Sequence, residues 1–190
     1  TAFFRESHHF PLLAEHIRHK QDPVTIWCSA ASTGEEPYSI AMTLLETLGA
    51  KASQAKVIAT DIDTDALAKA RKGIYPQEQV RKLDEARVKR FFQKGTGNHI
   101  GLARVRPEVS ALVEFMPLNL LAPQWPIKGP FDAIFCRNVM IYFDKETQAK
   151  ILKRFAPLMK QDGLLFAGHS ENFSYISDAF KLRGQTVYTL

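Results

Sequence analysis

Polar groups that could bind a nucleoside follow two buried, strand-like runs of this chain. Val24 to Ala30 is predicted as a first strand, which leads into a turn of small residues ending at Gly34. Lys56 to Thr60 is predicted as a second strand, and Asp61 ends it. Small residues allow backbone N–H groups and a helix N-terminus to approach a ligand closely. An acid at the end of the second strand holds the ribose in nucleoside-binding α/β sheets, so the spacing predicts a nucleoside cofactor bound by Asp61.

The turn matches neither of two common phosphate-binding loops. Ala30 and Ser32 stand where glycines of Gly-x-Gly-x-x-Gly would be, and no Gly-Lys-Ser/Thr is present. Glu35 and Glu36 follow the turn, where they would repel a pyrophosphate and favour a cation such as a sulfonium. This favours S-adenosylmethionine over a dinucleotide. The alternative is that both acids only stabilise the first turn of a helix.

Further candidates follow two later strands. Arg137 and Asn138 end a predicted strand, Phe131 to Cys136, and Tyr142 comes shortly after. An arginine placed beside a buried strand needs a partner, because burying an unpaired charge is costly. That partner is either a ligand or a structural salt bridge. Asn119, after the strand Val113 to Leu118, could offer its amide to an adenine edge or lie in a solvated loop.

Strands and helices alternate along most of the chain, which predicts an α/β domain with a mostly parallel sheet and helices on both faces. Helices are expected over 6–20, from Pro37 to Gly49, from Asp63 or Thr64 to Gly73, over 78–92, and from Asp144 to about Met159. The last two strands, Gly163–Gly168 and Gln185–Leu190, are expected to pair antiparallel at the sheet edge.

One segment breaks the alternation. Gly95, Gly97 and Gly101 lie between Phe91-Phe92 and Leu102–Val105, which predicts a β-hairpin. We therefore expect one domain over 1–190 that carries a small antiparallel insertion at 88–112.

The net charge, the apolar runs, the cysteines and the histidines indicate which partners and which cellular location to expect. A net charge of +5 favours an acidic partner. No apolar run reaches the roughly 20 residues that cross a bilayer, so no membrane insertion is expected. Cys28 and Cys136 lie in apolar runs and are predicted to be reduced core residues of a cytoplasmic protein. Most histidines are expected to be structural or on the surface and no metal site is predicted, whereas His169 is a candidate to line the site.

Several runs together closely resemble the chemotaxis receptor methyltransferases, the CheR family. The matching text is Ala2-Phe-Phe-Arg-Glu, Ala31-Ser-Thr-Gly-Glu-Glu-Pro-Tyr-Ser, Thr60-Asp-Ile-Asp, Phe135-Cys-Arg-Asn-Val-Met-Ile-Tyr-Phe and Gly168-His-Ser-Glu-Asn. The resemblance implies a Rossmann-like class I S-adenosylmethionine-dependent methyltransferase fold. It also implies methyl transfer from S-adenosylmethionine to glutamates in the cytoplasmic helices of chemoreceptors, which leaves S-adenosylhomocysteine. By this resemblance we expect that the helical N-terminal domain of the family is absent, and a monomer is expected.

The resemblance also assigns residues. The cofactor would be contacted or bordered by Thr1, Arg5, Glu36, Asp61, Asn119, Leu120, Arg137 and Asn138. Arg5 would reach the methionyl carboxylate, and Arg137 and Tyr142 would face the incoming glutamate as catalytic residues. The hairpin would bind a short peptide at the receptor C-terminus through Lys94, Gly95, Gly97 and Arg104.

Two other functions are compatible with parts of the sequence. A cofactor-sensing adaptor that binds receptors without transferring methyl is disfavoured by the joint presence of Arg5, Asp61, Arg137 and Tyr142. Methylation of nucleic acid is permitted by the charge. However, the chain lacks an Asn/Asp-Pro-Pro-Tyr run and a basic stretch interleaved with stacking aromatics, so no nucleic-acid partner is expected.

Overall fold

A seven-stranded sheet forms the centre of the computed structural model, which describes residues 1–190. The strands, in their spatial order, are β6 (Val113–Pro117), β2 (Lys56–Asp61), β1 (Thr25–Cys28), β7 (Phe131–Cys136), β8 (Met159–Ala167), β10 (Val187–Thr189) and β9 (Lys181–Gly184). The first five are parallel, and β10 runs antiparallel to both of its neighbours. The predicted α/β class with a mostly parallel sheet is confirmed.

The antiparallel pair lies where it was expected, but it is not the outermost one. β10 pairs with β8 as predicted, and β9 then pairs with β10 to form the edge. The sequence did not suggest β9, because its four residues are all exposed and lack an alternating apolar pattern. An edge strand needs only one hydrogen-bonded neighbour and no buried face, so it leaves a weak sequence signal.

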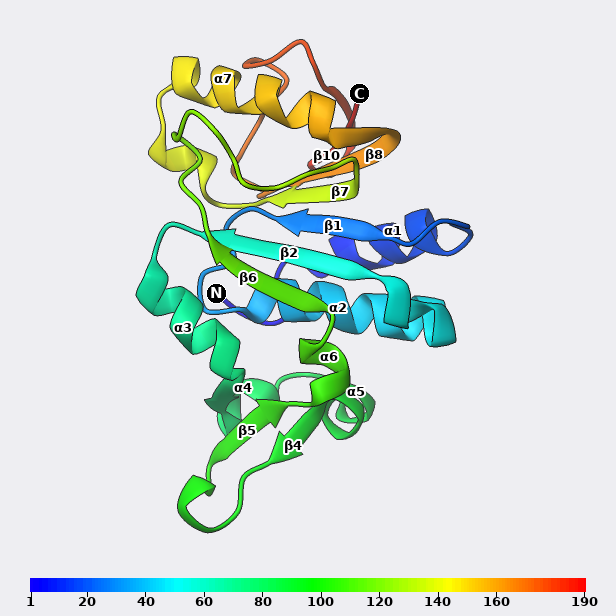
Figure 1. Cartoon of the computed structure of the whole chain (residues 1–190), viewed down its shortest axis with the longest axis vertical. Coiled ribbons are helices and arrows are strands. Elements are labelled where there is room, and N and C mark those ends of the chain that lie inside the picture. The colour runs from blue at the N-terminus through cyan, green and yellow to red at the C-terminus, as the bar shows by residue number, and fades with distance from the viewer.

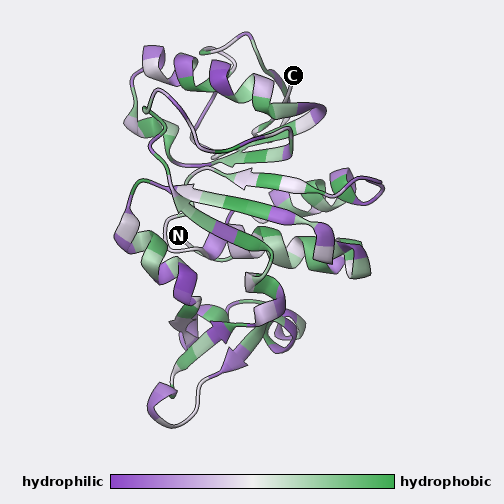
Figure 2. Ribbon diagram, in the orientation of Figure 1, coloured by the Kyte–Doolittle hydropathy of each residue, from purple (hydrophilic) through white to green (hydrophobic).

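Helices cover both faces of the sheet (Figure 1). α1 (His9–Ile17), α2 (Glu35–Leu48) and α3 (Thr64–Lys72) contribute to a buried cluster on one face, and α7 (Lys145–Phe155) to a second cluster on the other. β1 shows how one strand serves both layers, since Ile26 and Cys28 belong to the first cluster and Trp27 to the second. Figure 2 shows hydrophobic residues along the central strands and hydrophilic outer faces on α3 and α7.

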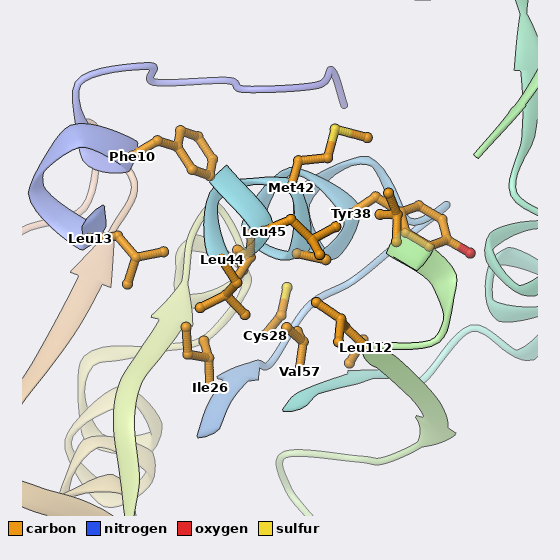
Figure 3. Packing of buried hydrophobic residues seen from close by; sticks show 14 of the residues in the cluster. Phe10, Leu13, Ile26, Cys28, Tyr38, Met42, Leu44, Leu45, Val57 and Leu112 are labelled. Carbon is orange, nitrogen blue, oxygen red and sulfur yellow. The ribbon is translucent and has the colours of Figure 1, made fainter. Parts of the chain in front are cut away.

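The first cluster fixes α2 over β1 and β2 (Figure 3). Met42, Leu44 and Leu45 of α2 lie above the strand residues Ile26 and Cys28, and Phe10 and Leu13 of α1 close the cluster on one side. Cys28 and Cys136 occupy opposite faces of the sheet, in different clusters. Both thiols are buried and free, as expected, and burial raises the pKa of each.

Capping aspartates and a glycine mark the ends of the helices that flank the site. The Asp63 carboxylate accepts hydrogen bonds from the N–H groups of Asp65 and Ala66 and so caps α3, which ends at Gly73 with φ +62°. Asp144 caps α7 in the same manner. These boundaries agree with the sequence. The helix expected over 78–92 is instead two short helices, α4 (Gln77–Val80) and α5 (Glu85–Phe91).

A separate three-stranded antiparallel sheet projects from one end of the molecule (Figure 1). It consists of β3 (Ile74–Pro76), β5 (Leu102–Val105) and β4 (Phe92–Lys94) in that order, and α6 (Pro107–Ser110) leads back to the large sheet. The hairpin β4–β5 is the one predicted from the glycines. β3 lies before residue 88, so the small sheet begins earlier in the chain than the expected insertion. None of the helices combines the length and the apolarity that crossing a bilayer requires.

Candidate functional site

A cavity of about 310 Å³ opens at the carboxyl ends of the parallel strands, where ligands bind in sheets of this kind. Residues from the segments after β1, β2, β6 and β7 converge on it. Its lining is mainly apolar, and it consists of Ser29, Ala30, Asp61, Ile62, Leu118, Asn119, Leu120, Leu121, Val139, Tyr142 and Phe143. An apolar cavity with a few polar groups is suited to an adenosyl group, whose ring is flat and whose ribose carries hydroxyls.

Asp61 is the carboxylate in this lining. Its Oδ2 accepts a hydrogen bond from the Ser32 N–H at 2.8 Å, and its Oδ1 accepts one from the Asp63 N–H at 2.9 Å. Each carboxylate oxygen can accept a second hydrogen bond, so the group keeps the capacity to receive two ribose hydroxyls. Asp61 therefore fixes the turn after β1 while it faces the cavity, and Asp63 takes the capping role of α3.

The turn after β1 is held in an unusual backbone conformation. Ser32 has φ +49° and Gly34 has φ +102°. A Cβ at Gly34 would lie 2.7 Å from the Tyr75 hydroxyl, which donates a hydrogen bond to the Thr33 carbonyl. Only glycine fits there without displacing its neighbours. The small residues thus serve close packing against the small sheet as well as access to a ligand.

Glu35 does not present a free charge to the cavity. Its side chain is buried and accepts hydrogen bonds from the hydroxyls of Thr33 and Thr1 and from the Gln79 amide. Thr1, a predicted cofactor neighbour, thereby lies beside the turn. The expectation that Glu35 and Glu36 together favour a cation needs revision, because Glu35 is already satisfied and Glu36 is neutralised by an arginine.

That arginine is Arg137, whose side chain is 3% exposed and lies outside the cavity lining. Its Nε donates to Glu36, and one terminal nitrogen donates to the Arg5 carbonyl at 2.7 Å and to His9 Nδ1 at 3.1 Å. Glu6 lies 3.6 Å from the same nitrogen. The structure thus gives Arg137 a different setting from the one expected. Through these contacts it joins the N-terminal segment, α1 and α2 to the segment after β7.

Burial sets the electrostatics of this network. It raises the pKa of Glu36, although Arg137 opposes the shift. It also lowers the pKa of His9 to about 4, and the charge of Arg137 acts in the same direction. Because Arg137 donates to Nδ1, His9 is neutral with its hydrogen on Nε2, which reaches the Gln185 carbonyl and the Thr186 hydroxyl. Arg137 and Glu36 form a salt bridge between the segment after β7 and α2.

Of the remaining predicted cofactor residues, Asn119 and Leu120 line the cavity, whereas Arg5 and Asn138 are not among its lining residues. Asn119 Oδ1 accepts a hydrogen bond from the Leu121 N–H, which leaves its amide nitrogen for a ligand. Asn138 has φ +61° at the end of β7. The side chain of Arg5 is exposed, while its carbonyl is held by Arg137.

Tyr142 is the catalytic candidate that the structure places at the cavity. It lies in the 3₁₀ turn η3 (Met140–Tyr142), lines the cavity and is 78% exposed. His169 is not among the lining residues and bonds to Glu6 instead.

The hairpin forms a second, smaller concavity of about 200 Å³. It is lined by Ile74, Gln93, Lys94, Gly95, Thr96, His99, Leu102, Ala103 and Arg104. A Cβ at Gly95 would collide with the His99 carbonyl, so glycine is required for the close turn. Gly97, with φ +59°, lies between these residues in the loop. Three of the four predicted peptide-binding residues therefore share one concave surface.

Sequence reasoning missed two buried polar residues that organise the site. His9 is fully buried, and Glu171 is 5% exposed. Glu171 accepts hydrogen bonds from the N–H groups of Asn138, Met140 and Gly168. The available signal was a carboxylate four residues after a buried strand, in the run from Gly168 to Asn172 that carried part of the resemblance.

Comparison with known proteins identifies the family. The model of the CheR methyltransferase SAM binding domain matches residues 1–189. The chemotaxis protein methyltransferase of Escherichia coli (strain K12) is 62% identical over 190 residues, which is all of this chain and 66% of that protein. Chemotaxis protein methyltransferase 2 of Pseudomonas aeruginosa is 54% identical over 192 residues and is covered to 69%. The chain thus spans about two thirds of the length of such relatives.

Among solved structures, a SAM-dependent methyltransferase from Methanosarcina mazei matches 83% of this chain, which covers 56% of that protein. The sequence identity is 14% and the TM-score is 0.48, so the likeness is weak.

Proposed function

This chain belongs to the CheR methyltransferase family, and on that premise we propose that it methylates glutamate side chains in the cytoplasmic helices of chemoreceptors. The product would be a glutamate methyl ester. The observation that carries the proposal is the mainly apolar cavity at the strand ends, whose lining includes both Asp61 and Tyr142. We further propose that the chain acts as a monomer in the cytoplasm, where those receptor helices lie.

The residues of the cavity fit S-adenosylmethionine. Asp61 would receive the ribose hydroxyls, and the walls from Leu118 to Leu120 would enclose the adenine, with the Asn119 amide at its edge. Arg5, whose side chain is free at the N-terminal segment, would reach the methionyl carboxylate. When bound, this cofactor supplies an electrophilic methyl group on a sulfonium.

The chain has no need of a general base, because a glutamate carboxylate is already ionised near neutral pH. Its task is to exclude water and to hold the two reactants in line. Val139 and Phe143 are apolar lining residues on the segment that carries Tyr142, and they would limit solvation of the bound carboxylate. Positioning of this kind can supply up to about 7–11 kcal/mol of the barrier in well-aligned systems. Tyr142 would donate a hydrogen bond to one oxygen of the substrate and leave the other to attack.

The decisive test is methyl transfer itself. The chain is incubated with radiolabelled S-adenosylmethionine and either a cytoplasmic receptor fragment or RNA. We expect alkali-labile label, typical of an ester, on the receptor fragment alone. Transfer to RNA, or binding of the receptor fragment without transfer, would instead support the two rival functions.

Tyr142→Phe tests the role of the hydroxyl. Since Tyr142 is largely exposed, its loss should leave folding and S-adenosylhomocysteine affinity intact and should lower kcat by at least about tenfold. Full turnover by this variant would show that the hydroxyl has no part in the reaction.

We also propose that the hairpin concavity binds a receptor C-terminal peptide. Lys94 and Arg104 supply positive charge beside the apolar Ile74 and Leu102, a combination suited to a peptide with acidic and apolar side chains. Such binding would raise the local concentration of the methylation region by tethering. Arg104→Ala should abolish peptide binding in calorimetry, while Arg81→Ala, an exposed arginine outside the concavity, should not. Unchanged affinity in Arg104→Ala would exclude this surface.

A further inference from the structure

A buried carboxylate joins the two loops that follow β7 and β8. Glu171 is 5% exposed and is not part of the cavity lining. Its Oε1 accepts hydrogen bonds from the Asn138 N–H at 2.7 Å and from the Gly168 N–H at 2.9 Å, and its Oε2 accepts one from the Met140 N–H at 2.9 Å. Three charge-assisted hydrogen bonds from backbone N–H groups stabilise this carboxylate, and they take the role that a cationic side chain would otherwise have.

The junction is closely packed and its backbone is constrained. β7 and β8 are parallel neighbours with Cys136 opposite Ala167, so Asn138 and Gly168 meet just beyond the strand ends. A Cβ on Gly168 would lie 2.5 Å from Asn138 Oδ1 and 2.9 Å from Glu171 Oε1. Asn138 is held at φ +61°, a region that few residues other than glycine adopt. Such a conformation persists where its surroundings determine it.

The segment that Glu171 holds is the one that carries Tyr142. The bonds to Asn138 and Met140 fix the backbone at the start of the η3 turn, and Phe143 N–H bonds back to the Met140 carbonyl. Tyr142 itself has an exposed side chain without a hydrogen-bond partner, so its position depends on this backbone. Val139 and Phe143 of the same segment line the cavity.

We propose that Glu171 is a positioning residue for methyl transfer, which fixes the segment 138–143 so that Tyr142 meets the substrate carboxylate. The proposal rests on the proposed function. Glu171 touches neither cofactor nor substrate, and it acts through the backbone of the η3 turn. Because a displacement of about 1 Å can cost about 100-fold in rate, loss of these bonds should lower kcat and spare the cofactor site around Asp61.

The test compares Glu171→Gln, Tyr142→Phe and the double variant. The glutamine keeps the shape but has one acceptor oxygen, and its NH₂ confronts an N–H donor. We expect kcat to fall about 10- to 100-fold, with S-adenosylhomocysteine affinity in calorimetry unchanged. If Glu171 acts through Tyr142, the double variant should lose little more than Tyr142→Phe alone. Losses that multiply, or wild-type kcat in Glu171→Gln, would overturn the proposal.

Two further measurements keep the inference testable. Amide hydrogen exchange should quicken in Glu171→Gln at Asn138 and Met140 while the central strands stay protected, and protection equal to wild type would refute the positioning role. This readout does not require turnover, so it separates failure of this inference from failure of the wild-type chain to methylate receptor. If Glu171→Gln does not fold, Gly168→Ala disturbs the same junction and should lower kcat in the same way. A folded Gly168→Ala variant with wild-type kcat would refute the proposal.

Discussion

The stability of this chain should fall in mild acid because of one histidine. His9 is fully buried, and it accepts a hydrogen bond from Arg137, which prevents it from taking a proton at Nδ1 without losing that bond. Its pKa is lowered from 6.5 to about 4. Replacing it by glutamine retains an acceptor for Arg137 and a donor for the Gln185 carbonyl, but removes the titration.

The magnitude follows from the two pKa values. Between about 4 and 6.5 the unfolded chain binds a proton at His9 that the folded chain does not. The contribution of the neutral, buried His9 to the unfolding free energy is therefore fully present above pH 6.5. This contribution is lost as the pH falls toward 4. At about 1.36 kcal/mol per pKa unit, the loss between pH 7 and pH 5 is about 2 kcal/mol of unfolding free energy.

Urea unfolding at both pH values measures this effect. The wild-type chain should lose about 2 kcal/mol more than His9→Gln on going from pH 7 to pH 5. The exposed His19, changed to glutamine, serves as the control and should follow the wild type. Glu36, whose pKa is raised, changes the unfolding free energy with pH in the opposite direction to His9. Because Glu36 is present in the wild type and in His9→Gln alike, the difference between the two isolates the effect of His9. Equal pH dependence in wild type and His9→Gln would refute the reasoning.

Three other predictions test the network and the cavity. Arg137→Met should cost about 3–5 kcal/mol in urea unfolding because it leaves a buried carboxylate unpaired, and adding Glu36→Gln should recover part of this; no recovery would mean that the ion pair is not the cause. Asp61→Asn should weaken S-adenosylhomocysteine binding in calorimetry by about 10- to 100-fold, since a hydrogen bond to a charged group contributes about 1.5–3 kcal/mol, and an unchanged affinity would remove Asp61 from the site. Gly34→Ala should lower the unfolding free energy by about 1–3 kcal/mol because its Cβ meets the Tyr75 hydroxyl, whereas wild-type stability would mean that the turn relaxes freely.

Local sequence signals were sufficient for most of the fold. The buried strands β1, β2 and β7 read as apolar runs, and Asp63, Gly73 and Asp144 mark the ends of helices through their own side chains or backbone freedom. The break between α4 and α5 was also readable, because Asp84 caps α5, but the charged run around it obscured the boundary. β9 and β3 could not be found in this way, since short strands with little buried surface depend on a neighbour to pair with.

The sequence by itself determined which groups stand at the strand ends, and hence that Asp61, Asn119 and Tyr142 would meet at one edge of a parallel sheet. Only the tertiary structure decided the environment of Arg137. Its partners Arg5, His9 and Glu36 are more than a hundred residues away along the chain, and no local pattern links them. The free energy of a charge depends on what surrounds it in space, so whether an arginine binds a ligand or a buried glutamate is settled when the chain folds.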